Sequence, residues 1–342
     1  MTLAIAAIVG VAALAISAAG GVGSASAGPQ ATFKAAMVSD TGNINDRSFN
    51  HLSKLGLDMA HSKLKAQTHI FISNSAADYL PNLSAAGRQG YQAIVATGFL
   101  LASDMSTAAT QFPNSKFAIV DFPWAFLKDK PANAVGLTFK SEQSGYLVGY
   151  LAGLMVKKQG GPQVVSAVGG KKLPSVDNWI AGYFAGAKKA NPKIKTYVDY
   201  SNQFSVQFSA QCKELALKQV AKGSQAIFQV AGGCGLGALD AAKANHKGKR
   251  PVWGIGVDAD QHYLGAYILT SGTKKVDVST YRFYKSVHDG KFKGGRDFVG
   301  TLANGLQGVG VISSKVPKSF VSQMNHIKQL IIKGKIKPPA TL

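Results

Sequence analysis

The feature of this sequence that most limits its fold is a repeated pairing of a short apolar segment with a longer amphipathic one. From residue 32 onward, each β-rich run is followed by a loop of Gly, Ser, Asn or Asp and then by a stretch with helical periodicity. Strands that alternate with helices form βαβ units, so the pattern predicts parallel sheets with helices on both faces. The expected strands are 33–38, 69–72, 93–96, 117–120, 134–139, 163–168, 194–198, 226–230 and 252–257.

Nine strands exceed one ordinary sheet, and 342 residues suit two α/β domains. We therefore expect two doubly wound lobes, with the chain passing from the first to the second near 141–145. A helix over 142–157, capped by Ser141, would open the second lobe.

The first 27 residues carry no charged side chain and are apolar or small. An apolar core over 3–18 followed by Ala25-Ser26-Ala27 is typical of a signal peptide that is cut before Gly28. A single membrane anchor is the alternative, although the stretch is short and contains glycine compared with a spanning helix of about 20 residues. No cysteine lies near this segment, so we expect an exported, extracytoplasmic protein without a lipid-anchor site.

The charge of the chain is strongly basic, with 38 Lys and Arg against 17 Asp and Glu, a net charge of +21. Only five of the basic residues are Arg, and they form no cluster, so we expect no nucleic-acid site. The scattered lysines predict a solvated basic surface, with adhesion or binding to anionic lipid as an alternative. The two cysteines, Cys212 and Cys234, can pair in an oxidising compartment, but the sequence leaves their pairing open.

Acidic and small residues follow the expected strands at their carboxyl ends, where doubly wound sheets bind ligands. Asp40, Asp121 and Asp258 place a carboxylate after three strands, and Gly232 and Gly233 would let a ligand approach the backbone after a fourth. One such Asp is often only a turn or cap residue. Three at equivalent positions indicate a polar ligand site.

The motifs of several other chemistries are missing from the sequence. The histidines lack metal-ligand spacing, and neither a phosphate-binding P-loop nor a nucleophile elbow occurs, so we expect no metal, no cofactor and no enzyme activity. Gly233, Gly235 and Ala238 do match G-x-G-x-x-A, with Asp258 twenty residues further on, as in dinucleotide-binding enzymes. Because the match lies in the second half of the chain, an NAD-dependent oxidoreductase remains only an alternative.

The run from Met37 to Asn50 reads MVSDTGNINDRSFN, and five further blocks follow it: 96–99, 117–121, 142–152, the glycine-rich turn after Phe228, and 256–261. In this order the blocks resemble the basic membrane protein (Bmp) family of ABC-transporter substrate-binding proteins, whose characterised members bind purine nucleosides. The resemblance covers roughly residues 33–300. It implies the type I periplasmic-binding-protein fold, in which two lobes joined by three crossings enclose a ligand.

On that fold we expect the chain to cross between lobes near Ser141, between Asp260 and Thr270, and near Gly305. The first lobe would then hold residues 32–142 and about 265–305. The second lobe would hold 143–264 and about 306–342.

The resemblance also implies roles for particular residues. It assigns the two faces of the base to Phe49 and Phe228, and polar contacts on the first-lobe side to Asp40, Asn50 and Asp121. It further implies that Asp258 binds the ribose hydroxyls, helped by a lysine after the next strand. That lysine is Lys274 or Lys275, of which Lys274 is preferred.

Together these features predict a monomeric, non-catalytic receptor that closes two lobes around a purine nucleoside and delivers it to an ABC permease. A receptor for a sugar or another small polar solute is the alternative, since aromatic rings with carboxylates also suit a pyranose. Three carboxylates without a phosphate-binding loop would repel a phosphate, so a nucleotide is disfavoured.

Overall fold

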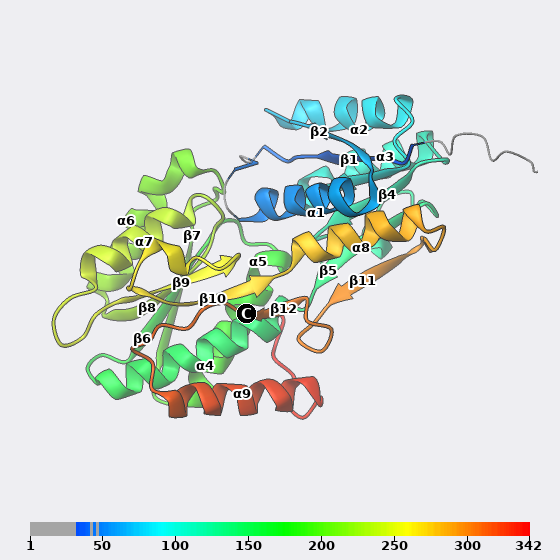
Figure 1. Ribbon diagram of the computed structural model, residues 1–342. Helices are drawn as coiled ribbons and strands as arrows, with labels where there is room; N and C mark the ends of the chain where they lie inside the picture. The colour runs from blue at the N-terminus through cyan, green and yellow to red at the C-terminus, as the bar shows by residue number, and fades with distance from the viewer. Residues whose placement is uncertain (1–31, 42–43, 46–47) are drawn as a thin grey trace, which may run out of the picture. The chain divides into compact units, whose positions relative to one another are not determined.

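Two six-stranded sheets form the framework of residues Thr32–Leu342 in the computed structural model (Figure 1). The model describes residues 32–41, 44–45 and 48–342. The predicted signal peptide, 1–27, lies outside the described residues, as do 42–43 and 46–47.

The first sheet has the strand order β11-β5-β4-β3-β1-β2, and all its neighbouring strands are parallel. One of its faces packs on α2 and α3, and the other on α1 and α8. The strands are β1 (Lys34–Val38), β2 (Gln67–Phe71), β3 (Ala93–Ala96), β4 (Lys116–Val120), β5 (Ala134–Phe139) and β11 (Arg296–Gly300). The helices are α1 (Phe49–Leu64), α2 (Tyr79–Arg88), α3 (Ala102–Gln111) and α8 (Val276–His288).

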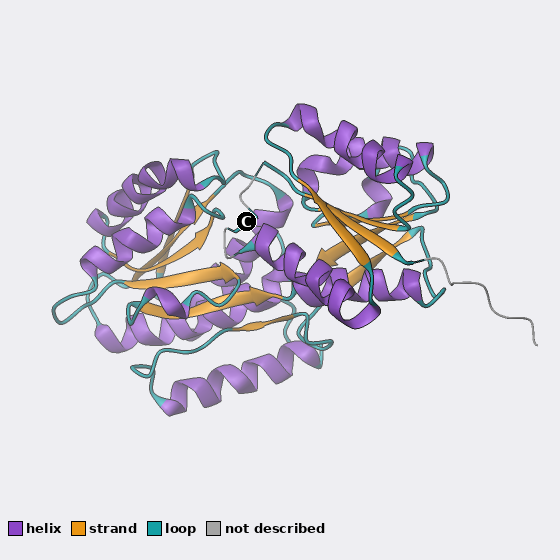
Figure 2. Ribbon diagram, turned by 45° about the horizontal axis from the view of Figure 1, so that its top comes forward, coloured by secondary structure: helices purple, strands orange, loops and turns teal. Residues whose placement is uncertain are grey.

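The second sheet has the order β12-β10-β9-β8-β6-β7 and is parallel except for β12. Helices α4, α5 and α9 pack on one face, and α6 and α7 on the other, so each sheet lies between helices (Figure 2). The strands are β6 (Val164–Gly169), β7 (Lys195–Tyr200), β8 (Ser224–Val230), β9 (Trp253–Asp258), β10 (Ile268–Lys274) and β12 (Gln307–Val309). The helices are α4 (Ser141–Gln159), α5 (Pro174–Ala190), α6 (Ser209–Ala221), α7 (Gly235–Asn245) and α9 (Lys318–Ile332).

Glycines bring α4 and α5 into close contact. A Cβ added at Gly145, Gly149 or Gly153 would overlap with backbone atoms of α5. Because these glycines recur every four residues, they lie on one face of α4. Their close packing fixes α5, which begins next to the cavity described below.

The predicted two-lobe, doubly wound α/β fold is confirmed, and all nine predicted strands are present with ends shifted by at most two residues. The predicted helix cap is wrong, because α4 already begins at Ser141 and Lys140 is the residue before it. The Ser141 hydroxyl instead accepts a hydrogen bond of 3.3 Å from the Gln307 side-chain amide.

The chain passes between the two sheets three times, after β5, after β10 and after β11. The first and third passages lie near Ser141 and Gly305, as expected. The second does not lie between Asp260 and Thr270, because β10 continues the second sheet to Lys274. The pattern of apolar residues did not predict this strand because Thr270 and Ser271 are polar. In the structure both side chains are nevertheless fully buried and hydrogen-bonded.

Candidate functional site

A cavity of about 600 Å³ lies where the carboxyl ends of the two sheets meet. Residues after β1, β2, β3 and β4 of the first sheet line it, together with residues at or after the ends of β6, β7, β8, β9 and β10 of the second. This volume is in the range of pockets that enclose a small ligand.

Eight of the nine predicted site residues line this cavity. They come from both lobes and from six separate elements of the chain: Asp40, Phe49, Asn50, Asp121, Gly232, Gly233, Asp258 and Lys274. The structure therefore brings together positions up to 234 residues apart in sequence, which is the difference between 40 and 274. Their contact with a ligand stays a prediction.

The ninth residue, Phe228, does not line the cavity, and its predicted position against the base is wrong. Its side chain is fully buried in the middle of β8, with ring centroids 6.0 Å from Trp179 and 5.1 Å from Tyr183. Helices cover both faces of the sheet that contains β8, so side chains on either side of this strand point into a hydrophobic core. Phe228 is therefore a core residue of the second lobe.

Phe204 is one of the second-lobe aromatic residues that line the cavity and that the sequence did not single out; Trp179, Phe208 and Tyr263 are others. Phe204 is half-buried, lines the cavity in the loop after β7, and makes an edge contact with Phe99 of the first lobe at 6.2 Å between ring centroids. A phenylalanine between Gln203 and Ser205, just past a strand end, is the signal that could have identified it.

The first-lobe wall of the cavity is built around Asp40, which follows β1. The Asn50 side-chain amide donates a hydrogen bond of 2.9 Å to an Asp40 carboxylate oxygen. Gly98, with φ of +106°, lets the Phe49 ring approach, since an added Cβ would lie 3.2 Å from that ring. The wall thus offers one aromatic face beside a carboxylate and an amide.

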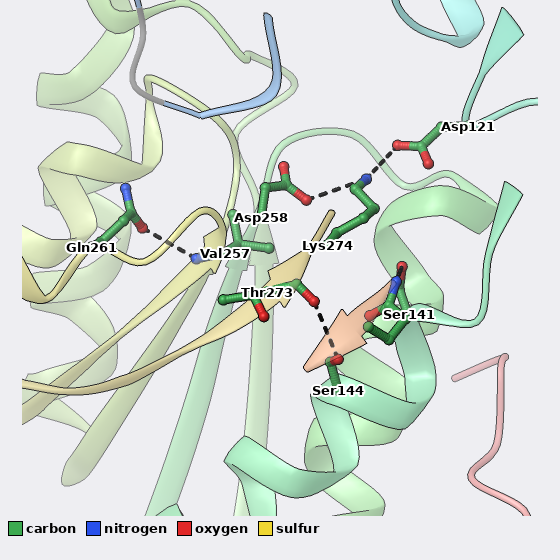
Figure 3. Close-up of polar contacts among 9 residues, drawn as sticks. Asp121, Ser141, Ser144, Val257, Asp258, Gln261, Thr273 and Lys274 are labelled. Atoms are coloured by element: carbon green, nitrogen blue, oxygen red, sulfur yellow. Dashed lines mark hydrogen bonds and ion pairs between the residues drawn. The ribbon is translucent and has the colours of Figure 1, made fainter. Parts of the chain in front are cut away.

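Lys274 joins the two lobes inside the cavity wall. Its ammonium donates to Asp121 of the first lobe at 2.5 Å and forms an ion pair with Asp258 of the second at 3.2 Å (Figure 3). The same ammonium lies 5.0 Å from the centre of the Phe49 ring. It also lies 5.5 Å from the centre of the Phe139 ring, so one cation faces two carboxylates and two aromatic rings.

The two aspartates reach Lys274 through an unusual backbone conformation. Asp121 has φ of 61° and Asp258 has φ of 63°, in the left-handed region that disfavours most residues with a Cβ. Asp121 directly follows β4 and Asp258 is the last residue of β9, so both lie at the carboxyl end of a buried strand, one in each lobe. The paired strain, of order 1–3 kcal/mol at each position, is typical of residues held for function.

Burial controls the protonation of this group. Loss of hydration raises the pKa of Asp121 above its ordinary value, although the Lys274 ammonium opposes the shift. For Lys274 burial alone would lower the pKa, but the two carboxylates outweigh it and the net shift is upward. Lys274 is therefore a stable cation at neutral pH.

The three passages of the chain between the lobes lie side by side next to Lys274. The Lys140 amide donates to the Gly300 carbonyl at 2.8 Å, and the Lys275 amide donates to Leu306 at 2.9 Å. The Ser144 hydroxyl donates to the carbonyl of Thr273, the residue before Lys274 (Figure 3). Lys274 thus lies at the hinge as well as in the cavity.

A disulfide between Cys212 and Cys234 settles the pairing that the sequence left open. Cys234 follows the cavity-lining glycines, and its amide donates a hydrogen bond of 3.1 Å to the Phe204 carbonyl. The covalent link therefore holds α6, the Phe204 loop and the glycine loop together.

The glycines that match a dinucleotide-binding motif have another role here. A Cβ at Gly235 would overlap with the buried side chain of Gln229, and one at Gly233 would lie 2.8 Å from the Val206 amide nitrogen. Close internal packing thus accounts for them without a dinucleotide. Among the residues that the structure describes, no group of His, Cys, Asp and Glu is arranged to hold a metal ion.

Comparison with known proteins gives agreement over most of the chain. Residues 33–341 match the family model described as Bmp, ABC transporter substrate-binding protein PnrA-like. A Lactococcus lactis subsp. cremoris protein named ABC transporter nucleoside-binding protein BmpA is 35% identical over 324 residues, 90% of this chain and 89% of that protein. An uncharacterized lipoprotein of Pyrococcus abyssi is 30% identical over 283 residues, 80% of this chain and 68% of that protein.

A solved structure also matches. The ABC transporter system solute-binding protein from Aeropyrum pernix K1 superposes with a TM-score of 0.79 at 25% identity. The match covers 90% of this chain and 94% of the other.

Proposed function

Because the chain belongs to the Bmp family of ABC transporter substrate-binding proteins, we propose that its cleft binds a purine nucleoside and presents it to a membrane permease. Proteins of this class bind small molecules without transforming them, so we expect stoichiometric binding and no turnover. The observation that carries the proposal is a cavity with aromatic residues and carboxylates supplied by both lobes.

The base would stack between Phe49 of the first lobe and Phe204 of the second. Both rings line the cavity and are half-buried, so each keeps surface that a ligand can cover. Stacking on both faces of a planar base is favourable and tolerates different bases. Asp40 and Asn50, hydrogen-bonded to each other, would bind the polar rim of the base.

The ribose hydroxyls would bind at Asp121, Asp258 and Lys274. The carboxylates accept hydrogen bonds from hydroxyls, and the ammonium donates to their oxygens. Gly232 and Gly233 would form the second-lobe edge of the ligand site, since both line the cavity.

The charge of the cavity favours a nucleoside over a nucleotide. Among the described residues that line the cavity, three carboxylates, those of Asp40, Asp121 and Asp258, outnumber two ammonium groups. Lys274 is buried and already paired with Asp121 and Asp258, and Lys171 is exposed. A phosphate placed near these carboxylates would be repelled more strongly than in water because the surroundings are partly buried.

The proposed place of action is outside the cytoplasm, next to the membrane that holds the permease. None of the helices in the described part of the chain has the length and apolar composition needed to span a bilayer. The relative in Pyrococcus abyssi is named a lipoprotein. We expect residues 1–27 to direct export, and we expect the protein to act as a monomer.

Calorimetric titration with adenosine, guanosine, inosine, their monophosphates, ribose and glucose tests the ligand class. At least one nucleoside should bind with one-to-one stoichiometry and more tightly than its monophosphate or ribose. Glucose binding tighter than every nucleoside would favour the sugar-receptor alternative. Asp258→Ala should weaken the binding of nucleosides much more than the binding of the free base, because only the ribose hydroxyls lose their hydrogen-bond acceptor.

A further inference from the structure

The basic residues of the second lobe gather where its helices end and its strands begin. This edge of the sheet is opposite to the cavity, and in Figure 1 the arrowheads of β9 and β10 point away from it. Four connections, α4 to β6, α5 to β7, α6 to β8 and α7 to β9, supply twelve exposed cations. We call these residues the basic end: Lys157, Lys158, Lys188, Lys189, Lys193, Lys195, Lys218, Lys222, Lys243, Lys247, Lys249 and Arg250.

Helix ends account for only part of this charge. Six of the twelve lie in the last turns of the four helices, where a cation interacts favourably with the helix dipole. Lys222 is the C-cap residue, directly after α6. Five lie beyond the helix ends, where the dipole does not favour them: Lys193, Lys195, Lys247, Lys249 and Arg250.

Carboxylates do not balance the basic end. No Asp or Glu occurs in 156–164, 187–196, 218–225 or 242–253. Among the residues that the structure describes, Lys218 is the one member in an ion pair, at 2.9 Å from Glu214 within α6. Of the other eleven, Lys222 lies 5.6 Å from the centre of the Tyr197 ring, and the remaining ten are left to solvent or to a partner.

Neutral amides hold the connections together instead. The Gln159 side chain donates to the Pro251 carbonyl at 3.1 Å, and that of Gln225 donates to the Gly160 carbonyl at 2.8 Å. The Gln225 side-chain oxygen accepts from the Gln163 amide at 2.9 Å, and the Asn191 side chain donates to that of Gln163 at 2.8 Å. These bonds link all four connections without adding negative charge, so the cations project from a frame that is already ordered.

We propose that the basic end binds the anionic surface of a lipid bilayer. Eleven of its twelve cations are lysines, which act as hydrated point charges and suit a diffuse layer of phosphate headgroups. Among the described residues of these four connections and their strands, Tyr197 in β7 is the one large aromatic side chain that is exposed, so the basic end lacks the series of rings on which nucleic-acid bases stack. The basic end lies opposite to the cavity, so binding there leaves the cleft open to ligand and permease, and the proposal does not depend on which ligand binds.

Vesicle co-sedimentation tests this proposal with the full chain. Vesicles that contain phosphatidylglycerol should bind the protein at low salt, and binding should fall by about tenfold or more as NaCl approaches 0.5 M, because screening shortens the electrostatic range. Pure phosphatidylcholine vesicles should bind far less. Equal binding to the two vesicle types would overturn the proposal, and so would tighter binding to duplex DNA than to the anionic vesicles at the same salt.

Two charge-matched variants decide whether the position of the charge matters. The first changes four lysines of the basic end to Glu: Lys193, Lys195, Lys247 and Lys249. The second changes four exposed lysines at the corresponding edge of the first lobe: Lys63, Lys128, Lys291 and Lys293. Each substitution removes one positive and adds one negative charge, so both variants lower the net charge by eight from +21.

The first variant should lose at least about tenfold in vesicle binding, whereas the second should keep most of it. Both should keep their ligand affinity, since neither set lines the cavity. Equal loss in the two variants would mean that net charge alone drives binding, which overturns the proposal. If the Glu variant of the basic end unfolds, the same four positions changed to Gln provide the test, with the same direction of effect.

Discussion

The ammonium of Lys274, at the end of β10 in the second sheet, lies 2.5 Å from a carboxylate oxygen of Asp121, which follows β4 in the first sheet. This bond crosses between the lobes at the place where the chain itself crosses, and only 3% of the Lys274 side chain is exposed. A buried pair of this kind contributes little net stability, yet removing one partner leaves an uncompensated charge. The pair is therefore suited to holding the lobes in register around a ligand.

Lys274→Met should weaken nucleoside binding by more than tenfold and lower the free energy of unfolding by about 3–5 kcal/mol, because Asp121 and Asp258 lose their shared cation. Calorimetric titration and thermal melting measure the two effects. Lys275→Met is the matched control, since its side chain is exposed and does not line the cavity. Equal loss of affinity in both variants would contradict the role given to Lys274.

Phe204→Ala should reduce nucleoside affinity by about 1–3 kcal/mol while the melting temperature changes little, since the ring is half-buried in a loop. Phe228→Ala should do the reverse. It should cost about 3–5 kcal/mol of stability by opening a cavity in the core, with affinity nearly kept below the melting temperature. If Phe228→Ala lost affinity without losing stability, the assignment of Phe204 to the base would be wrong.

The contrast between Phe228 and Phe204 indicates how far the sequence could predict this site. Strand ends could be located from apolar runs, so the aspartates and glycines beside them were placed at the cavity correctly. Residues inside a run, such as Phe228, carry no sign of the face they occupy when both faces are buried. Phe204 lies six residues after Val198, the last residue of the predicted strand, and a pattern that stops at the strand end does not include it.

The second crossing was misplaced for a related physical reason. Burial of the hydroxyls of Thr270 and Ser271 is compensated by hydrogen bonds that exist only in the folded protein. A local pattern of apolar residues therefore underestimates a strand whose polar side chains find distant partners. The resemblance implied a lysine after this strand but left the choice between Lys274 and Lys275 open, and in the structure Lys274 is the one of the two that lines the cavity.

Replacing both Cys212 and Cys234 by Ala should lower stability by about 3 kcal/mol, as expected for a link between residues 22 positions apart. Nucleoside affinity should also fall, by about two- to tenfold, because the Phe204 loop must then be ordered by the ligand. Met324→Ala in α9 is the control for destabilisation alone, since it opens the core of the second lobe and does not line the cavity. If Met324→Ala lowered nucleoside affinity as much as the double cysteine variant did, at the same loss of stability, the disulfide would have no role in positioning Phe204.

Acidification should weaken nucleoside binding at a pH above 3.8, the ordinary pKa of an aspartate, because burial raises the pKa of Asp121. Protonated Asp121 loses its pairing with Lys274 and one acceptor for the ribose. Its effect on stability has the opposite sign. The folded protein holds this proton more tightly than the unfolded chain, so Asp121 favours folding at low pH, and that contribution is lost as the pH rises through the raised pKa.

Titrations between pH 7 and pH 4, with melting curves at each pH, measure both effects. Asp121→Asn should bind more weakly at pH 7 and should lose the part of the pH dependence that lies above 3.8, since the amide does not titrate there. Lys274 would still pair with Asp258 in this variant, which keeps the hinge intact. A wild-type affinity that stays constant down to pH 4, or an Asp121→Asn variant with unchanged pH dependence, would exclude Asp121 as the titrating contact.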